Sequence, residues 1–172
     1  MVEVIGAGGP RDRASIPLAT RRGTPIPNER RLEQPPARLK VAVETLTAAH
    51  HTARCRSATG VYNCMGLVFA SRRTWVGPDQ LPMILTEDEY RPVPGPREMR
   101  AGDVAVYRMN GEVSHVGVVL RIEPDVAAAS WRVTIMSQWG ADGEYTHSIE
   151  DVPVLLGVPS EYWTDRRPIR DS

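Results

Sequence analysis

The second half of the chain is dominated by strand-like segments, and this pattern limits the folds open to it. Residues 103–108 alternate between apolar and other side chains, and an Asn-Gly pair follows at residues 110–111. Asn-Gly between two such runs is a strong signal for a tight hairpin turn. Further β-rich runs cover residues 113–122 and 131–137, and a last short segment covers 152–158. The sequence therefore predicts an antiparallel meander in this half.

The preceding part of the chain has helical features. Apolar residues near helical spacing predict a helix over about 37–50, with Pro36 just outside it. A second, buried helix is predicted over about 64–75, because Asn63 is a good N-cap residue and an apolar run follows it. Residues 77–100 form a Pro-rich connection. Helices followed by an antiparallel meander predict the α+β class.

The first 36 residues differ in composition from the rest. They are rich in Gly, Pro and Arg and show no sustained apolar period. Such a segment buries too little apolar surface to offset the loss of chain entropy. We therefore expect a flexible Pro/Gly/Arg-rich tail over residues 1–36, a folded domain over 37–160 and a C-terminal extension over 161–172.

The charges are balanced in total but unevenly distributed. The chain has 21 Lys and Arg against 21 Asp and Glu, yet residues 1–59 hold ten basic and five acidic residues. That basic part contains no aromatic residue, so we expect no nucleic-acid binding. No stretch approaches the roughly 18 apolar residues of a membrane span, and no Sec-type signal peptide is recognisable. Two cysteines, Cys55 and Cys64, suit a reducing compartment.

Cys64 and His115 are the residues most suited to chemistry. A cysteine at a helix N-terminus feels the helix dipole, and its backbone N–H is free to stabilise an anion. A buried structural cysteine is the alternative interpretation of Cys64. His115 begins a β-rich run, and Gly117 follows two residues later on the same strand face. We expect that glycine to leave open space beside the imidazole.

A hairpin is expected between the strands that contain Val118 and Ile135. When these two residues are paired, the apolar side chains of both strands lie together on one face of the hairpin. A slip of one residue would distribute them over both faces. The same register puts Gln138 opposite His115, within reach of one imidazole nitrogen. Gln138 is therefore the expected orienting residue for the histidine. His147, beyond a Gly-containing turn, is the alternative third residue.

Three segments resemble the motifs of the NlpC/P60 cysteine peptidases. Residues 63–68, Asn-Cys-Met-Gly-Leu-Val, are similar to the family's Asp-Cys-Ser-Gly-Leu/Phe-Val. Residues 101–107, Ala-Gly-Asp-Val-Ala-Val-Tyr, are similar to Pro-Gly-Asp-Leu-Val-Phe-Phe, and residues 114–119, Ser-His-Val-Gly-Val-Val, to a strand with His-Val-Gly-Ile-Tyr. The order and spacing of the three motifs agree over about 62–122.

Residues 137–140, Ser-Gln-Trp-Gly, also resemble a less typical bacterial branch of papain-like domains with Ser-Lys-Trp-Gly. His147 and residues 151–153 resemble the later His–Val-Pro segment of that branch. The chain departs from the main family at two positions beside the cysteine. Asn63 stands in place of Asp, and Met65 stands in place of Ser.

The resemblance implies a papain-like core in which N-terminal helices pack on an antiparallel β-meander. It implies that Cys64 attacks an amide carbonyl while His115 takes the thiol proton and later gives it to the leaving amine. Gln138 stands where the family has its third catalytic residue, usually a histidine. The backbone N–H of Cys64 would hold the oxyanion, with Tyr62 or Asn63 as possible contributors.

The expected function is therefore a cysteine-dependent peptidase or amidase that acts on a peptide or peptidoglycan-derived amide. Typical family substrates are γ-D-glutamyl–diamino acid links, whereas related folds deamidate proteins or transfer acyl groups. A catalytically weak or inactive binding module is the alternative, because of Gln138 and the altered residues around Cys64. Trp139 is a candidate for lining a substrate groove. A protein partner or inhibitor is possible.

No cofactor and no metal are expected. The candidate zinc ligands are His50, His51, Cys55 and Cys64. Their spacing along the chain matches no common zinc finger. Without a Sec-type signal, the expected location is either the cytoplasm or, for an effector or toxin, outside the cell after export by a specialised secretion system.

Overall fold

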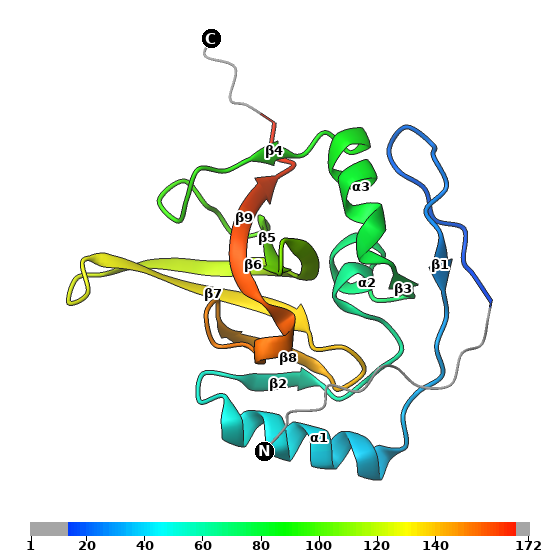
Figure 1. The fold of residues 1–172 in the computed structure, drawn as a ribbon, viewed down its shortest axis with the longest axis horizontal. Helices are drawn as coiled ribbons and strands as arrows, with labels where there is room; N and C mark the ends of the chain where they lie inside the picture. Colours follow the sequence, from blue (N-terminus) through cyan, green and yellow to red (C-terminus); the bar gives the residue numbers. More distant parts are fainter. Residues whose placement is uncertain (1–13, 168–172) are drawn as a thin grey trace.

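A seven-stranded antiparallel sheet forms the body of the computed structural model, which describes residues 14–167 (Figure 1). The strands are β2 (Arg54–Ser57), β4 (Arg91–Pro92), β5 (Val104–Met109), β6 (Glu112–Asp125), β7 (Ser130–Gln138), β8 (Glu144–Ser148) and β9 (Val158–Thr164). Their order in the sheet is β2-β8-β7-β6-β5-β9-β4. The meander predicted from the sequence is thus present as β5 to β8, and the chain is α+β.

Three α-helices, two short 3₁₀ helices and a small second sheet complete the fold. The helices are α1 (Pro36–Ala49), α2 (Cys64–Phe69) and α3 (Leu81–Glu87), with 3₁₀ turns η1 (Pro78–Gln80) and η2 (Val154–Leu156). The small sheet pairs β1 (Asn28–Glu29) with β3 (Trp75–Val76). Among the described residues, no helix has the length and apolar character needed to cross a membrane.

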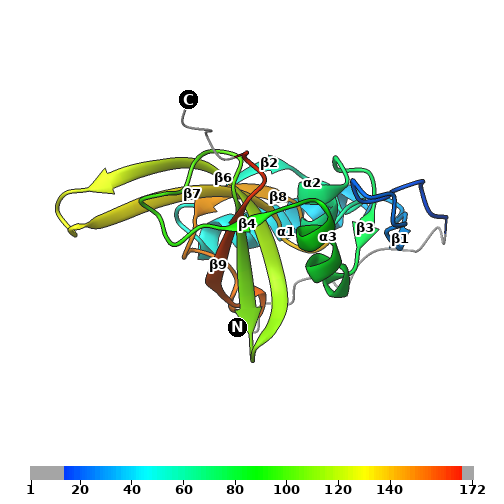
Figure 2. The ribbon, with the colours of Figure 1, turned by 90° about the horizontal axis from the view of Figure 1, so that it is seen from above.

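The helices pack on opposite faces of the main sheet, and alternate residues of β5 show this. Ala105 and Tyr107 belong to a buried cluster that includes Leu46 of α1. Val104 and Val106 belong to a second buried cluster, which includes residues of α2 and α3. Because successive side chains of a strand point to opposite faces, α1 covers one face while α2 and α3 cover the other. Figure 2 shows the far end of the β6–β7 hairpin projecting beyond these helices.

The first predicted helix is confirmed by α1, but the second ends earlier than predicted. Helix α2 stops at Phe69 because the backbone turns left-handed at Ser71 and Arg72, with φ of 49° and 63°. The N–H of Arg72 then returns to the carbonyl of Gly66 at 2.9 Å. The chain leaves this turn as strand β3, which occupies the last part of the predicted helix.

The predicted register of the β6–β7 hairpin is wrong by one residue. Val118 pairs with Met136 and Val119 with Ile135, and the register shifts again between Val119 and Arg121. This irregularity leaves Leu120 39% exposed. A bulge of this kind changes which residues share a face, and the apolar pattern alone does not reveal it.

Residues 14–35 are part of the fold, so the tail predicted over 1–36 is wrong for this stretch; residues 1–13 lie outside the described residues. The side chain of Asn28 accepts the N–H of Ile16 at 3.0 Å and donates to its carbonyl at 3.0 Å. Ile26 is 3% exposed in the cluster beneath α3. Side-chain hydrogen bonds and one buried anchor hold the segment without a periodic pattern.

The chain is also folded beyond residue 160, where an extension was predicted. Strand β9 runs to Thr164 and pairs with both β5 and β4. After it, Arg166 donates two hydrogen bonds to the buried carboxylate of Asp103, at 3.0 and 2.8 Å. The folded domain therefore includes β9 and the residues that follow it up to this pair.

We predict that Ile26→Ala will lower the free energy of unfolding by about 2–4 kcal/mol, because it deletes a buried side chain and leaves a cavity. Urea denaturation measures this change. Pro27→Ala is the matched control, since Pro27 is exposed. A loss below about 0.5 kcal/mol for Ile26→Ala would mean that this segment contributes nothing to the fold.

Candidate functional site

Cys64 is the first residue of α2, as the capping pattern predicts. The Oδ1 atom of Asn63 accepts the backbone N–H of Gly66 at 2.9 Å, which caps the helix. The same side chain accepts the N–H of Val76 at 3.2 Å and donates from Nδ2 to the Val76 carbonyl at 2.8 Å. Asn63 thus joins the start of α2 to β3 and fixes the position of Cys64. Because its amide is used in this way, Asn63 is not available to hold an oxyanion.

The Cys64 thiol is held at the contact between α2 and β6. Burial is the largest effect and raises the pKa of this thiol. Hydrogen bonds from the backbone N–H groups of Val116, Met65 and Cys64 itself lower the pKa in part. Two of these groups belong to the first turn of α2, whose N–H groups lack partners within the helix. The third belongs to the residue that follows His115. The sulfur therefore faces backbone donors of the kind that can stabilise negative charge.

His115 lies in β6 opposite Tyr107 of β5, and the two rings meet edge to face at a centroid distance of 5.2 Å. The residue is 1% exposed, and its Nε2 atom has no hydrogen-bond partner among the described residues. Burial, and then the nearby His147, lower the pKa of His115 to about 3. The imidazole is therefore neutral at pH 7, which is the form able to accept a proton.

Cys64 and His115 line the same cavity, of about 150 Å³. They make no hydrogen bond to each other, and the His115 ring packs on Tyr107, on the sheet face that α1 covers. The thiol pKa is raised and the imidazole pKa lowered, so the resting pair is uncharged. Both residues that the sequence singles out thus line one cavity.

Gln138 does not orient His115, because the hairpin register differs from the predicted one. Its Nε2 atom donates to the carbonyls of Thr59 at 2.7 Å and Gly140 at 3.1 Å. Its Oε1 atom is buried without a partner among the described residues. Gln138 pairs with Glu144 of β8, and alternation along β7 points its side chain away from the face that carries Ser137.

His147 lies on the same side of the sheet as His115 and forms part of a buried network. Its Nδ1 atom is 2.8 Å from the carbonyl of Ser148, so Nδ1 carries the proton there and Nε2 is an acceptor. The Ser137 hydroxyl, 2.8 Å from that Nε2, donates to it and accepts the indole N–H of Trp139 at 3.1 Å. Both polar atoms of His147 are thus used within the core. Sequence reasoning missed Ser137, which the corrected register places on this face.

The other predicted substrate contacts are also used within the fold. Trp139 is fully buried and stacks on Tyr145 at a centroid distance of 4.3 Å, so it lines no groove. Tyr62 donates its hydroxyl to Glu144 at 2.7 Å, and Arg72 donates to the same carboxylate oxygen at 2.7 Å. The space predicted beside His115 at Gly117 is filled, because a Cβ there would lie 2.7 Å from Ile135.

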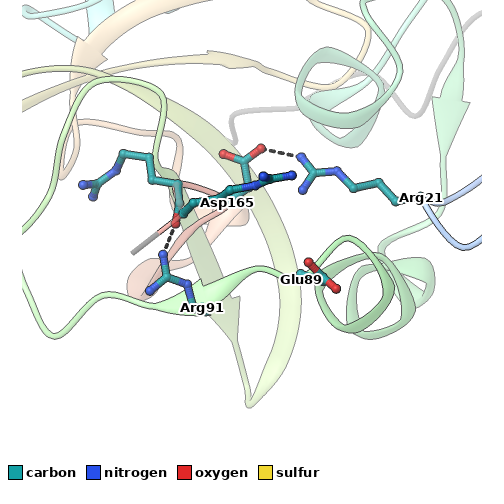
Figure 3. A pocket seen from close by; sticks show the side chains of 6 residues that line it. Arg21, Glu89, Arg91 and Asp165 are labelled. Atoms are coloured by element: carbon teal, nitrogen blue, oxygen red, sulfur yellow. Dashed lines mark hydrogen bonds and ion pairs between the residues drawn. The ribbon is translucent and has the colours of Figure 1, made fainter. Parts of the chain in front are cut away.

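A second cavity, of about 440 Å³, contains charged residues from both ends of the described chain (Figure 3). Arg21 pairs with Asp165 at 2.6 Å, and Arg91 donates to the carbonyl of Arg166. Of the described residues, no cysteine or histidine lines it. Together with the Arg38–Asp142 pair at 2.6 Å, these contacts show that basic residues of the first part of the chain meet acidic residues of the second.

His50 and Cys55 lie outside this site and contact other parts of the fold. Among the described residues, no group of three or more His, Cys, Asp and Glu side chains has the arrangement of a metal site. His50 instead lies 2.8 Å from the carboxylate of Asp151, which also accepts two hydrogen bonds from Thr52. Cys55 lies in β2, paired with Tyr145 of β8.

Comparison with known proteins gives no match. No family model, no curated protein and no solved structure is similar enough to the chain to place it in a family. Its function must therefore be argued from the arrangement of its own residues.

Proposed function

We propose that this protein is a cysteine-dependent amide hydrolase, a peptidase or amidase with a papain-like core of the NlpC/P60 type. The observation that carries this proposal is the cavity shared by Cys64 and His115. One residue begins a capped helix with backbone donors at its sulfur, and the other keeps a buried, unpartnered Nε2. Leaving such a nitrogen unpaired costs stability, and this kind of cost is typical of functional sites.

The topology supports a core of this type. The helix that begins with Cys64 packs on the antiparallel meander, and its contact strand β6 carries His115. The Ala-Gly-Asp motif leads into β5, the direct neighbour of β6. These are the relative positions that the resemblance implies for the three motifs.

In the proposed reaction, the Cys64 sulfur attacks the amide carbonyl carbon while the thiol proton moves to His115. The carbonyl π electrons move to oxygen, where the N–H groups at the start of α2 stabilise the oxyanion. When the oxyanion collapses, the C–N bond breaks and His115 gives its proton to the leaving amine. Water then hydrolyses the thioester, with His115 as the base, to release a carboxylic acid and restore the thiol.

The site is proposed to work as a Cys–His pair. Gln138 and His147 both use their side chains elsewhere, so neither holds the imidazole of His115. The edge of Tyr107 fixes the imidazole plane instead. We propose a peptide or peptidoglycan-derived amide as substrate and a protein inhibitor as a possible partner. We place the protein either in the cytoplasm or outside the cell after specialised export.

We predict that a thiol-reactive probe will label Cys64 at least tenfold faster than Cys55 at pH 7.5, and that His115→Ala will slow labelling of Cys64 by a similar factor. The physical reason is that only Cys64 has a base and backbone donors in its cavity. Peptide mass spectrometry after timed quenching measures both rates. His51→Ala is the control, because His51 is exposed on the turn after α1. Equal labelling of the two cysteines would contradict the proposal.

A binding module without turnover is the second candidate, and one observation favours it. Both pKa shifts oppose a thiolate–imidazolium pair, which active thiol enzymes commonly use. A module of this kind would label slowly and independently of His115. The same experiment therefore separates the two candidates.

A further inference from the structure

Among residues 14–167, no acidic side chain, no Lys and no Arg lines the cavity at Cys64. Its walls are largely apolar, and the side chains that form them include Met65, Trp75, Pro78, Val113 and Leu156. His115 is neutral at pH 7, because its pKa is lowered to about 3. The space in front of the sulfur therefore has no formal charge near neutral pH.

The polar groups on the cavity wall are already used in the fold. Ser114 donates its hydroxyl to the carbonyl of Leu156 at 2.7 Å. The indole N–H of Trp75 donates to the carbonyl of Gly60 at 2.9 Å. The side-chain amide of Asn63 is hydrogen-bonded to the backbone of Gly66 and Val76. What remains for a ligand is the Cys64 thiol with its backbone donors.

The size of the cavity limits what can enter it. At about 150 Å³ it matches the volume of an engineered apolar cavity that binds benzene. It therefore holds about six non-hydrogen atoms, the size of a short acyl group or one small side chain. The cavity is partly open to solvent, so a carboxylate or ammonium group placed there would lose part of its water, and it would meet no side chain of opposite charge among the lining residues.

We infer that this site accepts a short, uncharged acyl group and rejects a charged one. This inference rests on the proposed function and specifies its substrate class. It argues against γ-linked glutamyl substrates, whose free α-carboxylate lies close to the residue that reacts. It favours an amide flanked by small apolar groups, or a side-chain carboxamide.

Iodoacetamide and iodoacetate test this inference, because they have nearly the same size and differ in charge. Each alkylation rate at Cys64 is measured by mass spectrometry in the folded protein and again in urea. We expect the ratio of the amide rate to the acetate rate to be about tenfold higher in the folded protein, because burial without a partner penalises the carboxylate. An equal ratio in the two states would overturn the inference.

A new positive charge on the cavity wall should weaken the preference for the uncharged reagent. Pro78→Lys adds an ammonium group at an exposed position of the cavity wall. We expect this variant to raise the rate of Cys64 alkylation by iodoacetate at least fivefold relative to the rate with iodoacetamide. Val158→Lys is the matched control, since Val158 is 65% exposed and does not line the cavity. No change in Pro78→Lys would also overturn the inference. In both cases, labelling of Cys64 that still depends on His115 would leave the proposed function standing.

Discussion

Gly66→Ala is expected to lower the free energy of unfolding by about 3 kcal/mol or more, at the upper end of the cost of overpacking. A Cβ atom at this position would lie 1.8 Å from the carbonyl oxygen of Thr74 and 3.2 Å from the Cβ of Tyr62. The first of these atoms is backbone, so no change of rotamer relieves the clash. Helix α2 would have to move away from the chain segment leading into β3.

This displacement should also affect the site, because Gly66 donates its N–H to Asn63, the residue that caps α2 in front of Cys64. We therefore expect labelling of Cys64 to slow in the same variant. Thermal and urea unfolding measure the stability change, and for a domain of this size about 3 kcal/mol corresponds to a fall in Tm of about 6–12 °C. Gly95→Ala is the matched control, because a Cβ at Gly95 meets nothing within 4 Å. A Gly66→Ala variant as stable as Gly95→Ala would contradict the close approach of α2 and Thr74.

The parts of the fold that depend on neighbouring residues could be predicted from the sequence. Helix α1 follows from the apolar spacing after Pro36, and the β5–β6 turn follows from Asn110-Gly111. Both turn residues have positive φ, of 53° and 85°, as a two-residue turn of this type requires. The start of α2 at Cys64 follows from the capping residue before it.

The parts that depend on distant contacts could not be predicted. Strand β1 pairs with β3, more than forty residues further along the chain, and its segment has no periodic pattern. The end of α2 depends on left-handed backbone at Ser71 and Arg72, where glycine would be the usual signal. The Gly-, Pro- and Arg-rich composition indicated a flexible tail, whereas Arg21 of this segment pairs with Asp165.

The position of Cys64 at the start of a helix could be predicted, because it depends on residues close to it in the sequence. The role predicted for Gln138 is wrong, because it depends on the register of two strands. Cys64 and His115 both line one cavity. Gln138 was assigned through a pairing that is one residue out, and a shift of one residue moves every side chain to the other face. The actual neighbours of His115 on its face are packed core residues, among them Tyr107.

Acidification from pH 6 to pH 5 is expected to lower the free energy of unfolding by about 2 kcal/mol. Burial lowers the pKa of His115 to about 3 and that of His147 to about 4, against 6.5 for an ordinary histidine. Between these values the unfolded chain binds more protons than the folded one, so stability falls as the pH falls. The effect of these two histidines fades as the pH rises above 6.5, because the unfolded chain then also loses these protons. Each histidine changes the free energy of unfolding by up to about 1.4 kcal/mol per pH unit.

His147→Gln should remove about half of this slope, because glutamine takes up no proton and can accept a hydrogen bond from Ser137. The free energy of unfolding is measured by urea denaturation at several values between pH 7.5 and pH 5. His51→Gln is the control and should leave the slope unchanged, since His51 is exposed. Asp151, whose pKa is lowered to about 2, contributes only below about pH 4, where its stabilising charge is lost. If His147→Gln kept the full slope between pH 6 and pH 5, proton uptake would have to occur elsewhere, and the neutral state of buried His115 and His147 would be wrong.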